Sequence, residues 1–366
     1  MLTKWSHVII FVRESYKEIR HPTFGGSRLI KELKRELEKD NMKVSIISFH
    51  DMDTVSSRLL RIEKNQTHNF KGMLIKNEKL KWFLSLVIAL LAEIVTRFDF
   101  CLHLQIEEKM KKMKPDVVIY NGPAGASTVL NIVKKLNAQF ILCEHNVDYY
   151  FYLDKLGALF APLVYFLKII EISVCNKSDA IICFNQKDKE KLIMNGVLSS
   201  KVIVWKFHKK PQIFSKDKYL DKLPLKIRNL VKKSPIVCFL GANYAPNIIA
   251  VKHILKIAKE IPNIIFLIVG SVGNMFKYER KNIPKNVIFT GYVEDIKPYL
   301  SVADVFLNLK LTSDTGIEAK MFDYLEYGKP ILSTKIGTRG FEQYKNVLIV
   351  NNLNEMKKKL LELCGK

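Results

Sequence analysis

Short apolar runs alternate with stretches of helical periodicity along almost the whole chain. The run His7–Val12 predicts a buried strand, and Ser27–Lys39 after it predicts a helix whose leucines recur on one face. Strands alternating with helices are typical of parallel α/β sheets. Further strands of this first series are expected at Val44–Phe49, Val117–Tyr120, Phe140–Cys143 and Ala180–Phe184, with a helix at Ser127–Leu136.

A second α/β series begins at Ile236. Its expected strands are Ile236–Leu240, Ile264–Val269, Val287–Phe289, Val305–Leu309, Pro330–Ser333 and Val347–Val350, and its expected helices are Ile248–Lys259, Ile317–Tyr327 and Leu353–Leu363. The two series predict two facing, Rossmann-like, doubly wound domains. In such sheets ligands bind beyond the carboxyl ends of the strands.

Composition changes between the two series. The segment Lys201–Lys233 holds eleven Lys or Arg residues against Asp217 and Asp221 only, and prolines interrupt it. Such a charge run suits a linker better than a core. We therefore expect an N-terminal domain over 1–205, a basic linker region over 206–233 and a C-terminal domain over 234–366.

The overall composition excludes several protein classes. The chain has 366 residues, of which 48% are hydrophobic, so it can build sizeable cores and is not a collagen, a coiled coil or a disordered chain. Its 59 Lys and Arg against 36 Asp and Glu give a net charge of +23. This basic balance favours phosphates, nucleic acid, acidic glycans or an anionic membrane as partners. Of these we expect peripheral association with the inner face of an anionic membrane, and we do not expect nucleic acid.

Cysteines and apolar stretches indicate a cytoplasmic protein. The six cysteines are scattered without a C-x-x-C pair, which predicts buried free thiols in a reducing compartment. The N-terminal apolar run is shorter than the core of a signal peptide. The stretches Trp82–Val95 and Gly157–Val174 are short or interrupted for membrane spans and predict buried helices. Flanking lysines leave interfacial helices as the alternative.

The segment from Gly291 to Gly340 carries the most specific chemistry. Thr312–Gly316 leads into the expected helix at Ile317, and free amides at a helix start bind anions such as a diphosphate. Lys320 and Asp323 share a face of that helix, and a cation with a carboxylate suits a phosphate and ribose hydroxyls. A surface helix with a Lys–Asp pair is the alternative.

This segment resembles glycosyltransferase family 4, the retaining enzymes of the GT-B fold. The likeness rests on GYVEDIKPYLSVADVFLN and DTGIEAKMFDYLEYGKPILST, and FLGANYAPNIIAV and EHNVDYY are similar to further family segments. The resemblance implies that Lys320 meets the donor diphosphate and that Asp323 replaces the ribose-binding glutamate. It implies donor binding by Gly25, Gly26, Gly241, Gly291, Tyr292, Asp314, Thr315, Gly316, Ile317, Lys320 and Asp323.

The acceptor side is expected in the first domain. By resemblance His145, with Lys320, is a candidate catalytic residue, and Asn146 lies beside it. Asn121 stands where several relatives carry a histidine, which argues against a general base on that strand. The family's paired-acid pattern also places an acid where this chain has Thr315.

These expectations combine into a retaining transfer of a sugar from a nucleotide-diphosphate donor to an acceptor hydroxyl on a glycan, a lipid or a protein. Asp51-Met52-Asp53 matches the metal-binding D-x-D pattern of another glycosyltransferase fold, but we expect no metal and no cofactor besides the donor. Alternatives are a sugar-nucleotide epimerase and a nucleic-acid-binding or nucleic-acid-glucosylating protein. Aromatic residues in the basic run, such as Trp205 and Phe207, favour the last.

Overall fold

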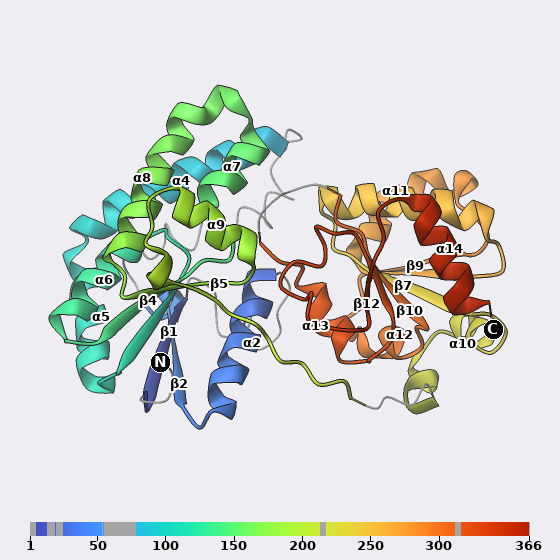
Figure 1. The fold of residues 1–366 in the computed structure, drawn as a ribbon, viewed down its shortest axis with the longest axis horizontal. Coiled ribbons are helices and arrows are strands. Elements are labelled where there is room, and N and C mark those ends of the chain that lie inside the picture. Colours follow the sequence, from blue (N-terminus) through green and yellow to red (C-terminus); the bar gives the residue numbers. More distant parts are fainter. Residues whose placement is uncertain are drawn as a thin grey trace. The chain divides into compact units, whose positions relative to one another are not determined.

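The computed structural model describes residues 5–12, 19, 25–52, 54, 78–212, 217–311 and 316–365. Its internal contacts divide the chain into two compact units, which Figure 1 shows. The first unit comprises Met1–Phe207 and Asp314–Ile317, and the second comprises His208–Ser313 and Glu318–Lys366. The basic segment is therefore grouped with the second unit from His208 onward.

The first unit is built on a parallel sheet of six strands in the order β2-β1-β3-β4-β5-β6. Every residue of β1 is buried, because this strand has a neighbour on each side and helices over the sheet. The strands are β1 His7–Val12, β2 Lys43–Ser48, β3 Val117–Asn121, β4 Gln139–Cys143, β5 Ala180–Cys183 and β6 Val202–Val204.

Helices pack around this sheet and enclose its core (Figure 1). Tyr120 lies at the centre of that core and stacks on both Phe11 and Phe140, with ring centroids 5.6 and 6.1 Å away. The helices are α2 Gly25–Lys39, α4 Glu78–Phe98, α5 Phe100–Met113, α6 Ala126–Lys135, α7 Asp148–Leu156, α8 Ala161–Lys177 and α9 Gln186–Met194. The 3-10 turns are η2 Phe49–Asp51, η3 Ala158–Phe160 and η4 Ser199–Lys201.

The two apolar stretches that were expected to be buried helices lie in α4 and α8. The prediction of burial is wrong for the outer side of each helix. Their inner sides meet in a cluster that joins Leu86 to Tyr152 and Leu167. Their outer sides leave residues such as Phe98 and Phe166 exposed. Composition alone does not distinguish an apolar helix that is buried on all sides from an apolar helix whose outer side is exposed.

The second unit has its own parallel sheet of six strands in the order β12-β11-β10-β7-β8-β9. The strands are β7 Ile236–Leu240, β8 Ile265–Val269, β9 Val287–Gly291, β10 Val305–Asn308, β11 Ile331–Ser333 and β12 Val347–Ile349. Its helices are α10 Leu225–Val231, α11 Ala245–Glu260, α12 Lys297–Ser301, α13 Lys320–Leu325 and α14 Leu353–Cys364, with 3-10 segments η5 Asp217–Lys222 and η6 Ser271–Asn282.

Both sheets confirm the predicted α/β class, and most expected strands agree with the observed ones within one or two residues. The edge strand β6 was not expected, because three residues inside a basic region give little periodicity. Five of the six cysteines are buried free thiols, but Cys101 is exposed, contrary to the prediction of burial.

Candidate functional site

Three glycines bring backbone segments close together where β7, β8 and β9 end. Gly241 N–H donates to Val269 O at 2.9 Å, and Gly270 N–H donates to Gly291 O at 3.0 Å. Gly270 has φ +105°, and a Cβ atom there would overlap the carbonyl oxygen of Gly241. Glycine is therefore required at this position for both its conformation and its space.

Lys320 is the centre of a polar cluster beside these glycines. Its Nζ donates to Asn247 Oδ1 at 3.0 Å, and it lies 4.5 Å from the centroid of the Phe239 ring. Glu318 Oε2 is 3.4 Å from Lys320 Nζ, and Glu318 Oε1 is 3.3 Å from Lys310 Nζ. The Lys320 side chain is only 10% exposed. The alternative of a surface Lys–Asp pair is therefore wrong.

The charges in this cluster depend on one another. Burial acts to raise the pKa of Glu318, but the ammonium groups of Lys320 and Lys310 outweigh it and hold that pKa below its ordinary value. Burial lowers the pKa of Lys320, and the Glu318 carboxylate opposes this effect. Two lysines against one glutamate leave a positive balance, which favours an anionic ligand.

The sequence did not single out Glu318, Lys310 or Asn247. Two of them carried a signal: Glu318 stands two residues before Lys320, and Asn247 lies in the segment GANYAPN. Lys310 follows β10 after one intervening residue and had no such signal. Only the fold brings the three side chains together.

The helix that carries Lys320 is shorter than predicted. It was expected over Ile317–Tyr327, but α13 begins at Lys320 and has 6 residues. Ala319 at its N-cap provides no side-chain cap hydrogen bond. No helix therefore starts at Ile317, and the free amides expected from such a start are not found there. The predicted donor residues Asp314 and Thr315 lie outside the described residues.

Gly316 belongs to the first unit and lies against two residues predicted for the acceptor side. It has φ +70°, and a Cβ atom there would overlap Asn146 Oδ1 and lie 2.9 Å from His145 O. Gly316 N–H donates to Asp188 Oδ2 at 3.0 Å, so the backbone is held by a buried carboxylate. Gly316, His145 and Asn146 therefore converge.

Another buried carboxylate, Glu171, holds the start of α7 next to this group. It accepts hydrogen bonds from Asp148 N at 2.6 Å and from Tyr149 N at 3.1 Å. Burial, together with the negative charge of Asp148, raises the pKa of Glu171 to about 8. The folded protein therefore binds a proton here more tightly than the unfolded chain does.

Replacement of Glu171 by glutamine should reduce the pH dependence of stability. The pKa rises from 4.5 to about 8 on folding, so this stabilisation is present below the lower value and is lost as the pH rises through the upper one. Relative to Glu171→Gln, the wild-type Tm should fall by roughly 5 °C or more between about pH 5 and 8.5. The matched control is exposed Glu190→Gln, which should behave as wild type. Parallel Tm curves for all three proteins would contradict the prediction.

Other predicted site residues lie at the starts and ends of elements or within α13. Gly25 begins α2, and half-buried Gly26 follows it. Asn121 is buried at the end of β3. Tyr292 is 70% exposed just after β9, and Asp323 is half-buried in α13.

The nucleic-acid alternative loses two of the aromatic residues that favoured it. Trp205 and Phe207 are buried in the first unit and offer no stacking surface. In the second unit, Lys209 Nζ of the basic run pairs with Glu326 Oε1 at 2.6 Å. Among the described residues no group of three or more His, Cys, Asp or Glu could hold a metal ion. Asp53 of the D-x-D pattern lies outside them.

Comparisons of sequence identify the family. Residues 24–206 match Glycosyltransferase Family 4, and residues 234–366 match Glycosyl transferases group 1. The first match alone spans half of the chain. No curated protein matches this sequence.

Comparisons of structure identify the fold. Sucrose-phosphate synthase from Thermosynechococcus elongatus has 14% identity and a TM-score of 0.61, over 98% of this chain and 90% of that one. HepE from Anabaena, in complex with UDP, has 11% identity and a TM-score of 0.59 over the same shares. A glycosyltransferase from Rickettsia africae has 14% identity and a TM-score of 0.55, over 98% of this chain and 88% of that one.

These matches confirm the predicted GT-B fold and the predicted enzyme class. The chain belongs to glycosyltransferase family 4.

Proposed function

We propose that this glycosyltransferase is a retaining enzyme that moves a sugar from a nucleoside-diphosphate sugar to an acceptor hydroxyl. The observation that carries the proposal is the buried ammonium of Lys320. It lies in a cluster of net positive charge beside the close glycine backbones of the second unit. A buried cation in a cluster of net positive charge is suited to an anionic leaving group such as a diphosphate.

Each donor-side residue has a role in this proposal. Lys320 would stabilise the charge that develops on the leaving diphosphate, with Asn247 fixing its direction. Asp323 would accept hydrogen bonds from the ribose hydroxyls, and the backbone at Gly291 and Tyr292 would lie beside the base. A donor phosphate oxygen would take the acceptor proton, as expected for the family. These roles rest on the family resemblance and on the positions of the residues within the second unit.

We place the acceptor on the first unit, near Asn121, His145 and Asn146. The acceptor would be a glycan, free or linked to a lipid or protein, and the enzyme would be cytoplasmic. Free cysteine thiols support that location. We further propose that no metal is needed, so that EDTA leaves the transfer rate unchanged.

A thermal-shift screen with UDP-, GDP- and ADP-sugars tests the donor assignment. UDP-sugars come first, because the related HepE structure contains UDP. A true donor at about 100 times its Kd should add about 2.7 kcal/mol of stability and raise the Tm. Lys320→Met should lose this shift. If no donor of the three stabilises the protein, the proposal fails.

Product analysis with the stabilising donor separates transfer from epimerisation. A transferase should release the nucleoside diphosphate in proportion to the sugar that reaches an acceptor or water. An epimerase should instead return an isomeric nucleotide sugar. Retention of the anomeric configuration in the product, followed by NMR, tests the stereochemistry.

A further inference from the structure

The helices on one side of the first unit expose an unusual amount of apolar surface. α4, α5, α6 and α8 pack against one another in this part of the fold (Figure 1). On the outer side of α4, apolar residues recur every three or four positions along the whole helix. Four of them are exposed by 43%, 46%, 54% and 83%: Leu80, Leu91, Ile94 and Phe98.

α8 repeats this arrangement. Its inner side buries Val164 and Leu167, while Tyr165, Phe166 and Ile169 are 53%, 61% and 52% exposed. Leu159, in the turn before α8, is 85% exposed. The helical segment Ala158–Lys177 is long and apolar enough to cross a membrane, and 28% of its most apolar window is buried. Exposed apolar patches of this kind mark interaction surfaces.

The carboxylates described within these two helices point inward. Glu93 is 2% exposed, and it accepts a hydrogen bond from Gly125 N at 2.7 Å. Glu171 of α8 is fully buried, and its carboxylate contacts the start of α7. The exposed charged side chains described on α4 and α8 are basic and include Lys79, Arg97 and Lys177. The outer faces therefore combine apolar and positively charged groups.

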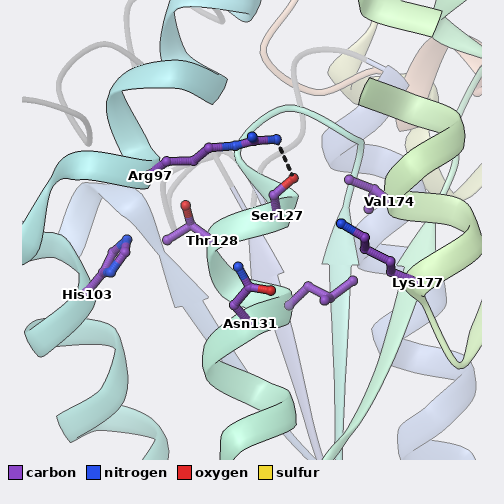
Figure 2. Close-up of a pocket in the computed structure, with 8 residues that line it drawn as sticks. Arg97, His103, Ser127, Thr128, Asn131, Val174 and Lys177 are labelled. Carbon is purple, nitrogen blue, oxygen red and sulfur yellow. Dashed lines mark hydrogen bonds between the residues drawn. The ribbon is translucent and has the colours of Figure 1, made fainter. Parts of the chain in front are cut away.

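A polar cavity of about 200 Å³ lies over α6, between the ends of α4 and α8 (Figure 2). Its lining contains two cationic groups, and Arg97 Nη2 donates to Ser127 Oγ at 3.4 Å while also pairing with Glu93 Oε1 at 3.2 Å. Thr128 Oγ1 also lines it, is buried, and has no hydrogen-bond partner. The lining residues are Arg97, His103, Ser127, Thr128, Leu130, Asn131, Val174 and Lys177.

We propose that this face docks on a bilayer of anionic phospholipid. The apolar rows of α4 and α8 would enter the headgroup region, and the cavity would receive a lipid phosphate between Arg97 and Lys177. Because the inner side of α8 is packed and Glu171 is fixed in that packing, the helix would lie in the interface and would not span the membrane.

A second copy of the chain fits this face less well. A twofold contact would place the same basic groups opposite one another, and among the side chains that the structure describes on α4 and α8 no exposed carboxylate would pair them. A lipid phosphate supplies that negative charge. The net charge of +23 also favours binding to an anionic bilayer over contact with a second copy of the chain. The docking proposal does not depend on the proposed sugar transfer.

Vesicle co-sedimentation of the full-length protein tests the proposal. Binding should be strong to phosphatidylcholine vesicles that contain phosphatidylglycerol, and weak to phosphatidylcholine alone. Leu91→Glu, Phe98→Glu and Phe166→Glu should each weaken binding at least about tenfold. Lys177→Gln should weaken it about fivefold. The matched control is Leu361→Glu on α14, since Leu361 is 47% exposed and Leu91 is 46% exposed. It should bind as wild type.

Several outcomes would overturn the proposal. They are no binding to anionic vesicles and unchanged binding of all three apolar variants. A dimer that the same variants dissociate would show an interface between copies instead. Retention on membranes after carbonate washing would indicate a spanning helix. Donor-induced Tm shifts of the variants should equal that of wild type, so failure of docking and failure of the donor site are distinguishable.

Discussion

Replacement of Lys320 by methionine is expected to lower kcat/KM for sugar transfer about 100- to 1,000-fold. The ammonium is nearly buried, is directed by Asn247, and is placed to stabilise negative charge on the leaving diphosphate. Methionine keeps most of the length and apolar contact of the side chain against Phe239. Glu318 keeps its second partner, Lys310, at 3.3 Å, so the fold should survive. Steady-state kinetics with the stabilising donor measure the effect.

The control for this prediction is Lys357→Met in the same unit. Lys357 Nζ also pairs with a carboxylate, Glu260 Oε2 at 2.6 Å, but this pair lies at the surface. Its loss should change neither kcat/KM nor Tm appreciably. A Lys320→Met enzyme that folds and transfers sugar within about twofold of wild type would exclude Lys320 from the donor site.

Sequence periodicity predicted the strands well because parallel strands are buried on both faces. In β1 and β8 every residue is buried, so each strand is a continuous apolar run that contrasts with its polar flanks. Helix bounds were predicted less well where packing, and not sequence, decides them. The helix expected from Ile317 begins only at Lys320, and the residue before the expected start, Gly316, is bound to Asp188.

The candidate site could be predicted only in part. Lys320 and the glycines belong to recognisable segments, but its partners Glu318, Lys310 and Asn247 come from different loops and helices. Lys310 and Asn247 lie far from Lys320 in the sequence and approach it only in the folded chain, so no spacing links them to it. The same limit applies to α4 and α8: their composition predicted helices, but only the structure shows that Glu93 and Glu171 point inward and that apolar residues point outward.

Replacement of Gly270 by alanine is expected to destabilise the second unit by about 3 kcal/mol or more. Two costs add: φ of +105° is strained for any residue with a Cβ, and that Cβ would overlap the backbone oxygen of Gly241, which cannot rotate away as a side chain can. The matched control is Gly291→Ala, which has φ +70° and no atom nearer than 3.8 Å to the added Cβ. It should cost only about 1 kcal/mol. Urea unfolding of both variants measures the difference. Equal losses of unfolding free energy in the two variants would mean that the conformation of Gly270 matters and its close approach to Gly241 does not. A larger loss for Gly270→Ala would show that this backbone contact holds the glycine cluster together.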